Sequence, residues 1–214
     1  MSKAVMLSIR PKWVEKIASG EKTIEVRKTK PKLETPFKCY IYCTVEMAGY
    51  DALWVLDAPT REKYSLVAVS AYLENPEGAN KGNGKVIGEF TCDRIYEIRK
   101  RGIPENFDYC YLSLNEWGND DIETEIKAIS ASCVSKEKLN AYGAKAPLLY
   151  GWHISDLKIY DKPRELREFK KNNRDCFYAD LGLAKRDCPD CKNSGCFLER
   201  PPQSWCYVEV TEDV

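Results

Sequence analysis

The stretch Gly20-Glu21-Lys22-Thr23-Ile24-Glu25-Val26-Arg27 combines a glycine with charged and β-branched residues. From Thr23 onward polar and apolar side chains alternate, which predicts a strand. The alternation places Glu25 and Arg27 side by side on one face, with Lys22 at the start of the strand. Two interpretations are open at this point. The charges form either an ion pair on the surface of an edge strand, which contributes little stability, or part of a functional site.

The residues before this stretch predict a strand that leads into a helix. Pro11 suits the first helical position, because a proline lacks the N–H that has no helical partner there. Apolar side chains then recur at helical spacing, at Trp13, Val14, Ile17 and Ala18. Gly20 suits the position after the helix, since glycine tolerates a positive φ. A strand–helix–strand unit is therefore expected here.

This unit, with its G-x-K-x-x-E-x-R pattern, resembles the ASCH family (activating signal cointegrator homology). The match is clearest over residues 7–28 and looser over residues 38–44, 85–96 and 150–160. In that family the polar residues of the motif line a cleft proposed to hold RNA or a modified nucleoside. The resemblance implies this role for the residues at the matching positions, Lys22, Glu25 and Arg27.

The resemblance also implies the fold class. It predicts an α+β protein with a PUA-like β-barrel and flanking short helices over residues 1–162. Residues 46–84 are expected to be an insertion between two barrel strands, because turn signals follow one another there. Residues 163–214, which have no counterpart in a minimal ASCH domain, are expected to form a separate cysteine-rich segment.

Further elements follow from local patterns. Residues 38–44 alternate and predict a strand, and residues 85–92 start another that continues to about residue 98. Residues 103–125 are interpreted as a long irregular connection. Ser135 is a candidate N-cap of a short helix. Residues 151–160 predict the final strand of the barrel.

Composition and charge limit the classes of partner that the protein is expected to bind. The chain of 214 residues has 33 basic and 33 acidic residues, so no general affinity for polyanions is expected. Residues 3–32, however, contain nine basic and three acidic residues, and this excess coincides with the motif. No apolar run reaches membrane-spanning length and the N-terminus lacks a signal-peptide core, so we expect a cytoplasmic protein without membrane contact.

The cysteines near the C-terminus indicate a metal site. Cys188 and Cys191 form a C-x2-C pair and Cys196 follows closely, a spacing that lets thiolates converge on one tetrahedral ion. Cys176 is the expected fourth ligand and Cys206, in the strand-like residues 205–209, is the alternate. Four thiolates close the coordination sphere, so we predict a structural zinc ion. An iron–sulfur cluster and unliganded thiols are the alternatives.

The function favoured by the sequence is binding of a nucleic acid, RNA above all, or of a modified nucleoside. In this hypothesis Arg27 holds a phosphate or a base edge through its fork geometry, and lysines attract phosphate. Tyr150 and Trp152 are candidates to stack on a base, although core packing suits at least one of them better. The candidate ligand-binding residues are Arg10, Lys12, Lys22, Glu25, Arg27 and Lys28.

Two alternatives stay open. Some ASCH-like proteins are amidohydrolases that deacetylate N4-acetylcytidine, and others are reported to cleave RNA. Lys22 matches the lysine of those amidohydrolases, but Glu25 stands where they have a threonine nucleophile. A water-based route would use Glu25 as general base, with Lys22 or Arg27 stabilising the oxyanion. The second alternative is a scaffold that binds a protein partner. The single histidine, His153, is more typical of a structural or exposed residue.

Overall fold

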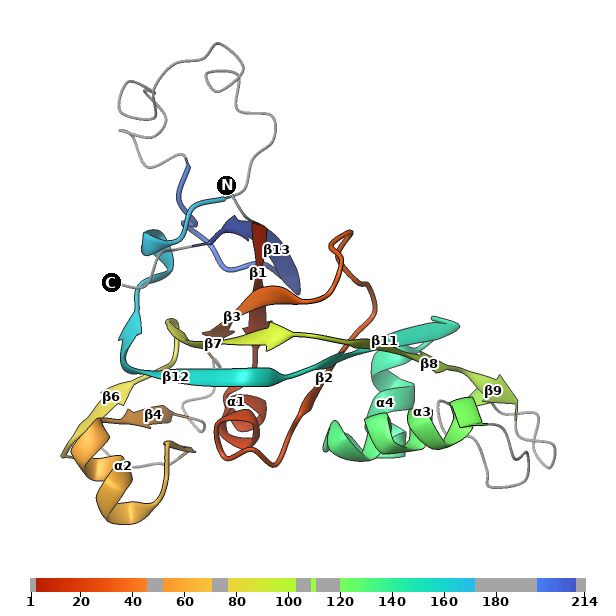
Figure 1. Ribbon diagram of the computed structural model, residues 1–214, viewed down its shortest axis with the longest axis horizontal. Coiled ribbons are helices and arrows are strands. Elements are labelled where there is room, and N and C mark those ends of the chain that lie inside the picture. Colours follow the sequence, from red (N-terminus) through yellow and green to blue (C-terminus); the bar gives the residue numbers. More distant parts are fainter. Residues whose placement is uncertain are drawn as a thin grey trace, which may run out of the picture. The chain divides into compact units, whose positions relative to one another are not determined.

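The computed structural model describes residues 3–45, 52–70, 77–102, 109–110, 120–171 and 196–210 (Figure 1). The chain divides into two compact units. The first contains Met1–Ser19, Phe37–Phe90 and Leu157–Val214, and the second contains Gly20–Pro36 and Thr91–Asp156.

The first unit is built on a five-stranded sheet with the strand order β12-β7-β3-β1-β13. β1 runs parallel to β3 and antiparallel to β13. The strands are β1 (Lys3–Ile9), β3 (Phe37–Cys43), β7 (Val86–Cys92), β12 (Ser155–Arg164) and β13 (Trp205–Glu209). A short 3-10 helix, Leu166–Glu168, follows β12. The strand expected for residues 38–44 is therefore present, and so is the strand expected for residues 205–209.

The helix α1 (Pro11–Ala18) follows β1 as the sequence predicts. Arg10 is its N-cap and Pro11 its first residue. Val14 and Ile17 are fully buried, so the apolar side of the helix faces the core of the first unit. Gly20 has a φ of +78°, the left-handed conformation that ends helices and that glycine adopts without strain.

The region expected to be an insertion carries secondary structure of its own. Its described residues contain a three-stranded sheet of order β5-β4-β6 and a helix α2. The elements are β4 (Leu53–Leu56), α2 (Ala58–Tyr64), β5 (Ala68–Ser70) and β6 (Ala79–Lys81). Arg61 ties α2 to β12, because its guanidinium donates to the carbonyl oxygens of Ile159 at 3.2 Å and Tyr160 at 2.9 Å.

The second unit is built on a three-stranded antiparallel sheet of order β2-β11-β8. Its elements are β2 (Ile24–Arg27), β8 (Ile95–Arg99), β9 (Arg101–Gly102), β10 (Tyr109–Cys110), α3 (Asp120–Ala131), α4 (Lys136–Gly143) and β11 (Leu148–His153). Val26, Ile98 and Leu149 on one face of this sheet form a buried cluster with Ile129 of α3 and Leu139 of α4. The opposite face carries the charged residues and is described below.

Two helix predictions had different outcomes. The short helix after Ser135 is confirmed as α4, with Ser135 as N-cap and its hydroxyl oxygen accepting from the Lys138 N–H at 3.4 Å. The prediction of an irregular connection up to residue 125 is wrong at its end, because α3 begins at Asp120. The start of α3 is acidic, and acidic side chains suit the first turn of a helix.

The predicted closed barrel is not found in the described part of the chain, where the strands form separate sheets of five, three, three and two strands. The physical reason is that two predicted long strands are each broken. β7 ends at Cys92 and β8 begins at Ile95, while β11 ends at His153 and β12 begins at Ser155. The halves on either side of each break pair in different sheets. The correct description is a mixed α+β fold of open sheets.

Among the described helices, none has the length and apolar character needed to cross a membrane.

Candidate functional site

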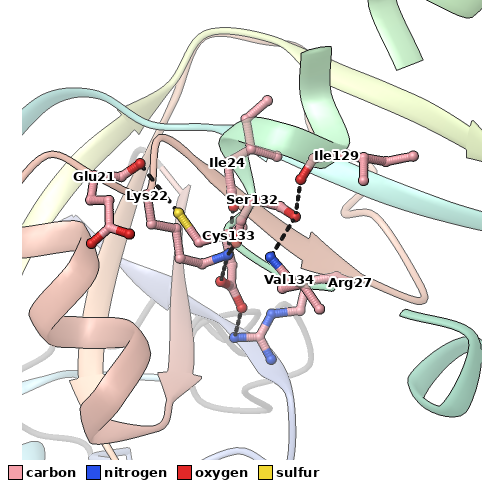
Figure 2. A network of polar contacts seen from close by, with 9 residues as sticks. Glu21, Lys22, Ile24, Arg27, Ile129, Ser132, Cys133 and Val134 are labelled. Carbon is pink, nitrogen blue, oxygen red and sulfur yellow. Dashed lines mark hydrogen bonds and ion pairs between the residues drawn. The ribbon is translucent and has the colours of Figure 1, made fainter. Parts of the chain in front are cut away.

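Lys22 lies at the centre of a buried polar network in the second unit (Figure 2). Its ammonium group donates to the carbonyl oxygen of Ser132 at 2.6 Å and to that of Ile24 at 2.7 Å. The Nζ atom also lies 3.3 Å from Oε2 of Glu25. The residue is only 2% exposed. An ammonium has three N–H donors, and these three acceptors suffice to satisfy them.

Glu25 connects this lysine to Arg27. Its Oε1 atom lies 3.0 Å from Nη2 of Arg27, while Oε2 faces Lys22. The side chains of Glu25 and Arg27 are each 9% exposed. The predicted neighbourhood of Glu25 and Arg27 is therefore confirmed. The interpretation as an ion pair on the surface is wrong, because both partners are buried and the carboxylate is compensated by two cations.

The turn after α3 supplies the other side of the network. Ser132 is fully buried, and its hydroxyl group donates to the carbonyl oxygen of Ile129 at 2.6 Å. Cys133 has a φ of +56°, and its thiol donates to the carbonyl oxygen of Glu21 at 3.3 Å. The Thr23 N–H donates to the carbonyl oxygen of Ala131 at 3.1 Å. Residues 131–133 thus hold the segment that precedes β2.

We call one face of the β2-β11-β8 sheet the charged face, and its members follow from strand register. Opposite residues of an antiparallel pair project to the same side of a sheet. Tyr150 of β11 lies opposite Arg27 of β2 and Glu97 of β8, and Trp152 lies opposite Glu25. By register this face comprises Glu25, Arg27, Ile95, Glu97, Arg99, Leu148, Tyr150 and Trp152. A row Arg27–Tyr150–Glu97 therefore crosses the sheet.

The two aromatic residues of the charged face differ in burial. Trp152 has no exposed surface and serves as a core residue. Tyr150 is half-buried, and the Nζ atom of Lys30 lies 5.1 Å from the centre of its ring. The expectation that core packing suits at least one of them is confirmed for Trp152. Tyr150 is the partly exposed aromatic residue of this face and lies opposite Arg27 in the register.

The remaining candidate ligand-binding residues divide between the units. Lys28 is exposed in the second unit, with Nζ 5.1 Å from the ring centre of Tyr142. Burial raises the pKa of Tyr142, while the nearby Arg27 acts in the opposite direction. Arg10 and Lys12 are exposed and belong to the first unit, at the start of α1. The structure therefore groups Lys22, Glu25, Arg27 and Lys28 in one unit, and Arg10 and Lys12 in the other.

The chemistry available to the buried network favours fixed charges over proton transfer. All three N–H donors of Lys22 have acceptors in reach, and both oxygens of Glu25 face cations. A general base needs a lone pair directed at the proton it removes, so Glu25 would have to release one cation first. The geometry therefore fits the positioning of Arg27 better than the hydrolytic role predicted for Lys22 and Glu25.

A second polar pair lies on the same unit. The Nδ1 atom of His153 lies 2.6 Å from Oδ1 of Asp93, and the ring of Tyr96 meets the imidazole edge-on, with centres 6.5 Å apart. The hydrogen bond to His153 is the main cause that lowers the pKa of Asp93. This pair ties the turn between β7 and β8 to β11. It agrees with the structural interpretation of His153.

The predicted zinc ligands lie mostly beyond the described residues. Cys176, Cys188 and Cys191 fall outside them, and Cys196 and Cys206 are half-buried. Within the described part of the chain, no group of three histidine, cysteine or acidic side chains is placed to hold a metal ion. Cys206 packs against the core of the first unit, and burial raises the pKa of its thiol to about 11.

Sequence reasoning did not find Ser132, Glu97 or the row through Tyr150. Ser132 acts through its backbone carbonyl oxygen, which any residue would supply, so no sequence signal marks it. Glu97 and Arg99 were detectable in principle, because they alternate with Tyr96 and Ile98 in β8.

The structure is similar to the crystal structure of ASCH from Zymomonas mobilis, with 13% sequence identity, a TM-score of 0.44 and coverage of 96% of this chain and 87% of that one. Structures of two mutant proteins of that ASCH are similar too, each with a TM-score of 0.44. The match to one has 13% sequence identity and covers 97% of this chain and 91% of the mutant protein. The match to the other has 12% identity and covers 96% of this chain and 88% of the mutant protein. No residue role is transferred from these structures to this chain. No family model and no curated protein matches the chain.

Proposed function

We propose that the protein binds RNA or a modified nucleoside on the charged face of the second unit, with a base stacked on Tyr150. The observation that carries the proposal is the row in which Tyr150 lies between Arg27 and Glu97, with the Nζ atom of Lys30 over one face of its ring, 5.1 Å from the centre. An aromatic ring flanked by cations is the usual platform for an unpaired base, and each stacked base contributes about 1–3 kcal/mol.

Arg27 is suited to fix the orientation of the base. Its guanidinium is held by Glu25, and Glu25 in turn is held by Lys22. An arginine whose guanidinium is already anchored loses little conformational freedom when it contacts a ligand. In this proposal the conspicuous motif residues Lys22 and Glu25 position Arg27, and the ligand itself contacts Arg27 and Tyr150.

The test is binding of a fluorescein-labelled single-stranded RNA of eight uridines, followed by fluorescence anisotropy. Tyr150→Leu should weaken binding by about 5- to 150-fold, the equivalent of about 1–3 kcal/mol. Tyr64→Leu is the matched control, because Tyr64 is an exposed tyrosine of the first unit with the Nζ atom of Lys63 4.8 Å from its ring centre. Equal affinities for the wild type and Tyr150→Leu would exclude this binding face.

A further inference from the structure

Glu97 has the same arrangement of charges as Glu25 but lies at the surface. Its Oε1 atom is 3.4 Å from Nζ of Lys30, and its Oε2 atom is 3.2 Å from Nη2 of Arg99. The exposed fractions of these side chains are 39% for Glu97, 47% for Lys30 and 63% for Arg99. One exposed carboxylate thus bridges two exposed cations from different segments of the chain.

The position of this bridge relates it to the proposed binding face. Glu97 lies opposite Tyr150 in the register of β8 and β11, and Lys30 contacts both Glu97 and the ring of Tyr150. The two cations hold the pKa of Glu97 below its usual range, chiefly through the hydrogen bond from Arg99 and then through Lys30. Lys30 of the bridge therefore lies over one face of the ring on which a base would stack.

We propose that Lys30 and Arg99 form a phosphate-binding subsite, and that the carboxylate of Glu97 occupies it in the free protein. This inference rests on the proposed function and adds the class of ligand. A phosphate group offers several anionic oxygens to a lysine and an arginine, whereas a free nucleoside offers none. The expected ligand is a nucleotide or an RNA strand, with its phosphate beside the stacked base.

Because the ion pairs of Glu97 are exposed, a phosphate can take the place of its carboxylate. Surface ion pairs contribute little stability, so a phosphate can displace Glu97 from Lys30 and Arg99 easily. The buried pairs of Glu25 cannot exchange in this way, because breaking them would leave an uncompensated charge inside the protein. Glu97 then acts as a competitor of the ligand, and its removal should increase affinity.

The experiment measures RNA affinity at several salt concentrations for the wild type and three variants. Glu97→Gln should tighten binding of the eight-uridine RNA by about two- to five-fold. Lys30→Met and Arg99→Met should each weaken binding and reduce the slope of log affinity against log salt by about 0.7, the value for one phosphate of a single strand. Asp161→Asn is the control for Glu97→Gln, because it removes one exposed carboxylate from the first unit.

A competition experiment tests the ligand class separately. Uridine 5′-monophosphate should displace the labelled RNA at lower concentration than uridine does, and Glu97→Gln should enlarge this difference. If RNA binds and Tyr150→Leu weakens it, but the variants of Glu97, Lys30 and Arg99 behave as the wild type, the phosphate subsite is wrong and the binding face stands. If neither RNA nor uridine 5′-monophosphate binds, both proposals are wrong.

Discussion

Replacing Lys22 with methionine tests whether the buried network stabilises the second unit. Methionine has a similar length and no charge, so it removes the ammonium group with little change of volume. The carbonyl oxygens of Ile24 and Ser132 then lose their Lys22 donor, and Glu25 keeps one cation instead of two.

The magnitude follows from the burial of these groups. Removing one partner of a buried ion pair costs about 3–5 kcal/mol, and a buried carbonyl oxygen without a donor costs about 1–3 kcal/mol. These effects overlap, since Arg27 still compensates Glu25 and the methionine side chain adds apolar contacts. We therefore expect Lys22→Met to lower the free energy of unfolding by about 3–5 kcal/mol in total.

The assay is urea unfolding followed by circular dichroism. Lys28→Met is the matched control, because Lys28 is an exposed lysine of the same segment, and it should leave the midpoint unchanged. Lys22→Met combined with Glu25→Gln should lower the free energy of unfolding by less than the sum of the two single substitutions, since the two residues interact directly. If Lys22→Met lowers stability by less than about 0.5 kcal/mol, as a surface substitution does, the network is not structural.

Three further predictions follow. The hydrogen bond from His153 lowers the pKa of Asp93 in the folded protein. The pair therefore stabilises the fold above the unfolded pKa of an aspartate, and this stabilisation is lost as the pH falls through the lower folded pKa. His153→Ala should flatten the decline of stability below about pH 4, as measured by thermal unfolding. Gly88→Ala should destabilise the five-stranded sheet in urea unfolding, because the added Cβ would lie 2.5 Å from the carbonyl oxygen of Lys158; an unchanged midpoint would contradict this packing. The cysteine-rich segment should bring about one zinc ion per chain by elemental analysis, and chelation should lower the unfolding midpoint; protein purified without metal and indifferent to chelators would exclude the site.

The parts of the fold that could be predicted are those determined by neighbouring residues. Pro11 and Gly20 mark the ends of α1, and alternation identifies β2 and places Glu25 beside Arg27. These signals depend only on residues a few positions apart in the sequence. They fail where a strand ends because its pairing partner changes, as happens between β7 and β8.

The contact that defines the site could not be predicted for a different reason. Lys22 donates to a backbone carbonyl oxygen 110 residues away, and every residue type has such an oxygen. The acceptor is positioned by the turn at residues 131–133, which in turn depends on α3. A buried lysine therefore requires the tertiary structure to explain it, and the sequence alone favoured an exposed role.

Burial separates the roles of two glutamates that have the same chemistry. Glu25 and Glu97 lie on the same face of one sheet, and each bridges a lysine and an arginine. In the buried bridge, loss of one partner leaves a charge that neither water nor another ion compensates. The ions must therefore stay together, and they fix the position of Arg27. In the exposed bridge, water and salt compensate either partner, so the ions can separate and accept a phosphate. Substitution to glutamine should therefore lower the free energy of unfolding at position 25 and raise the affinity for RNA at position 97. The two different effects of one substitution, more than either effect alone, distinguish a positioning network from a binding subsite.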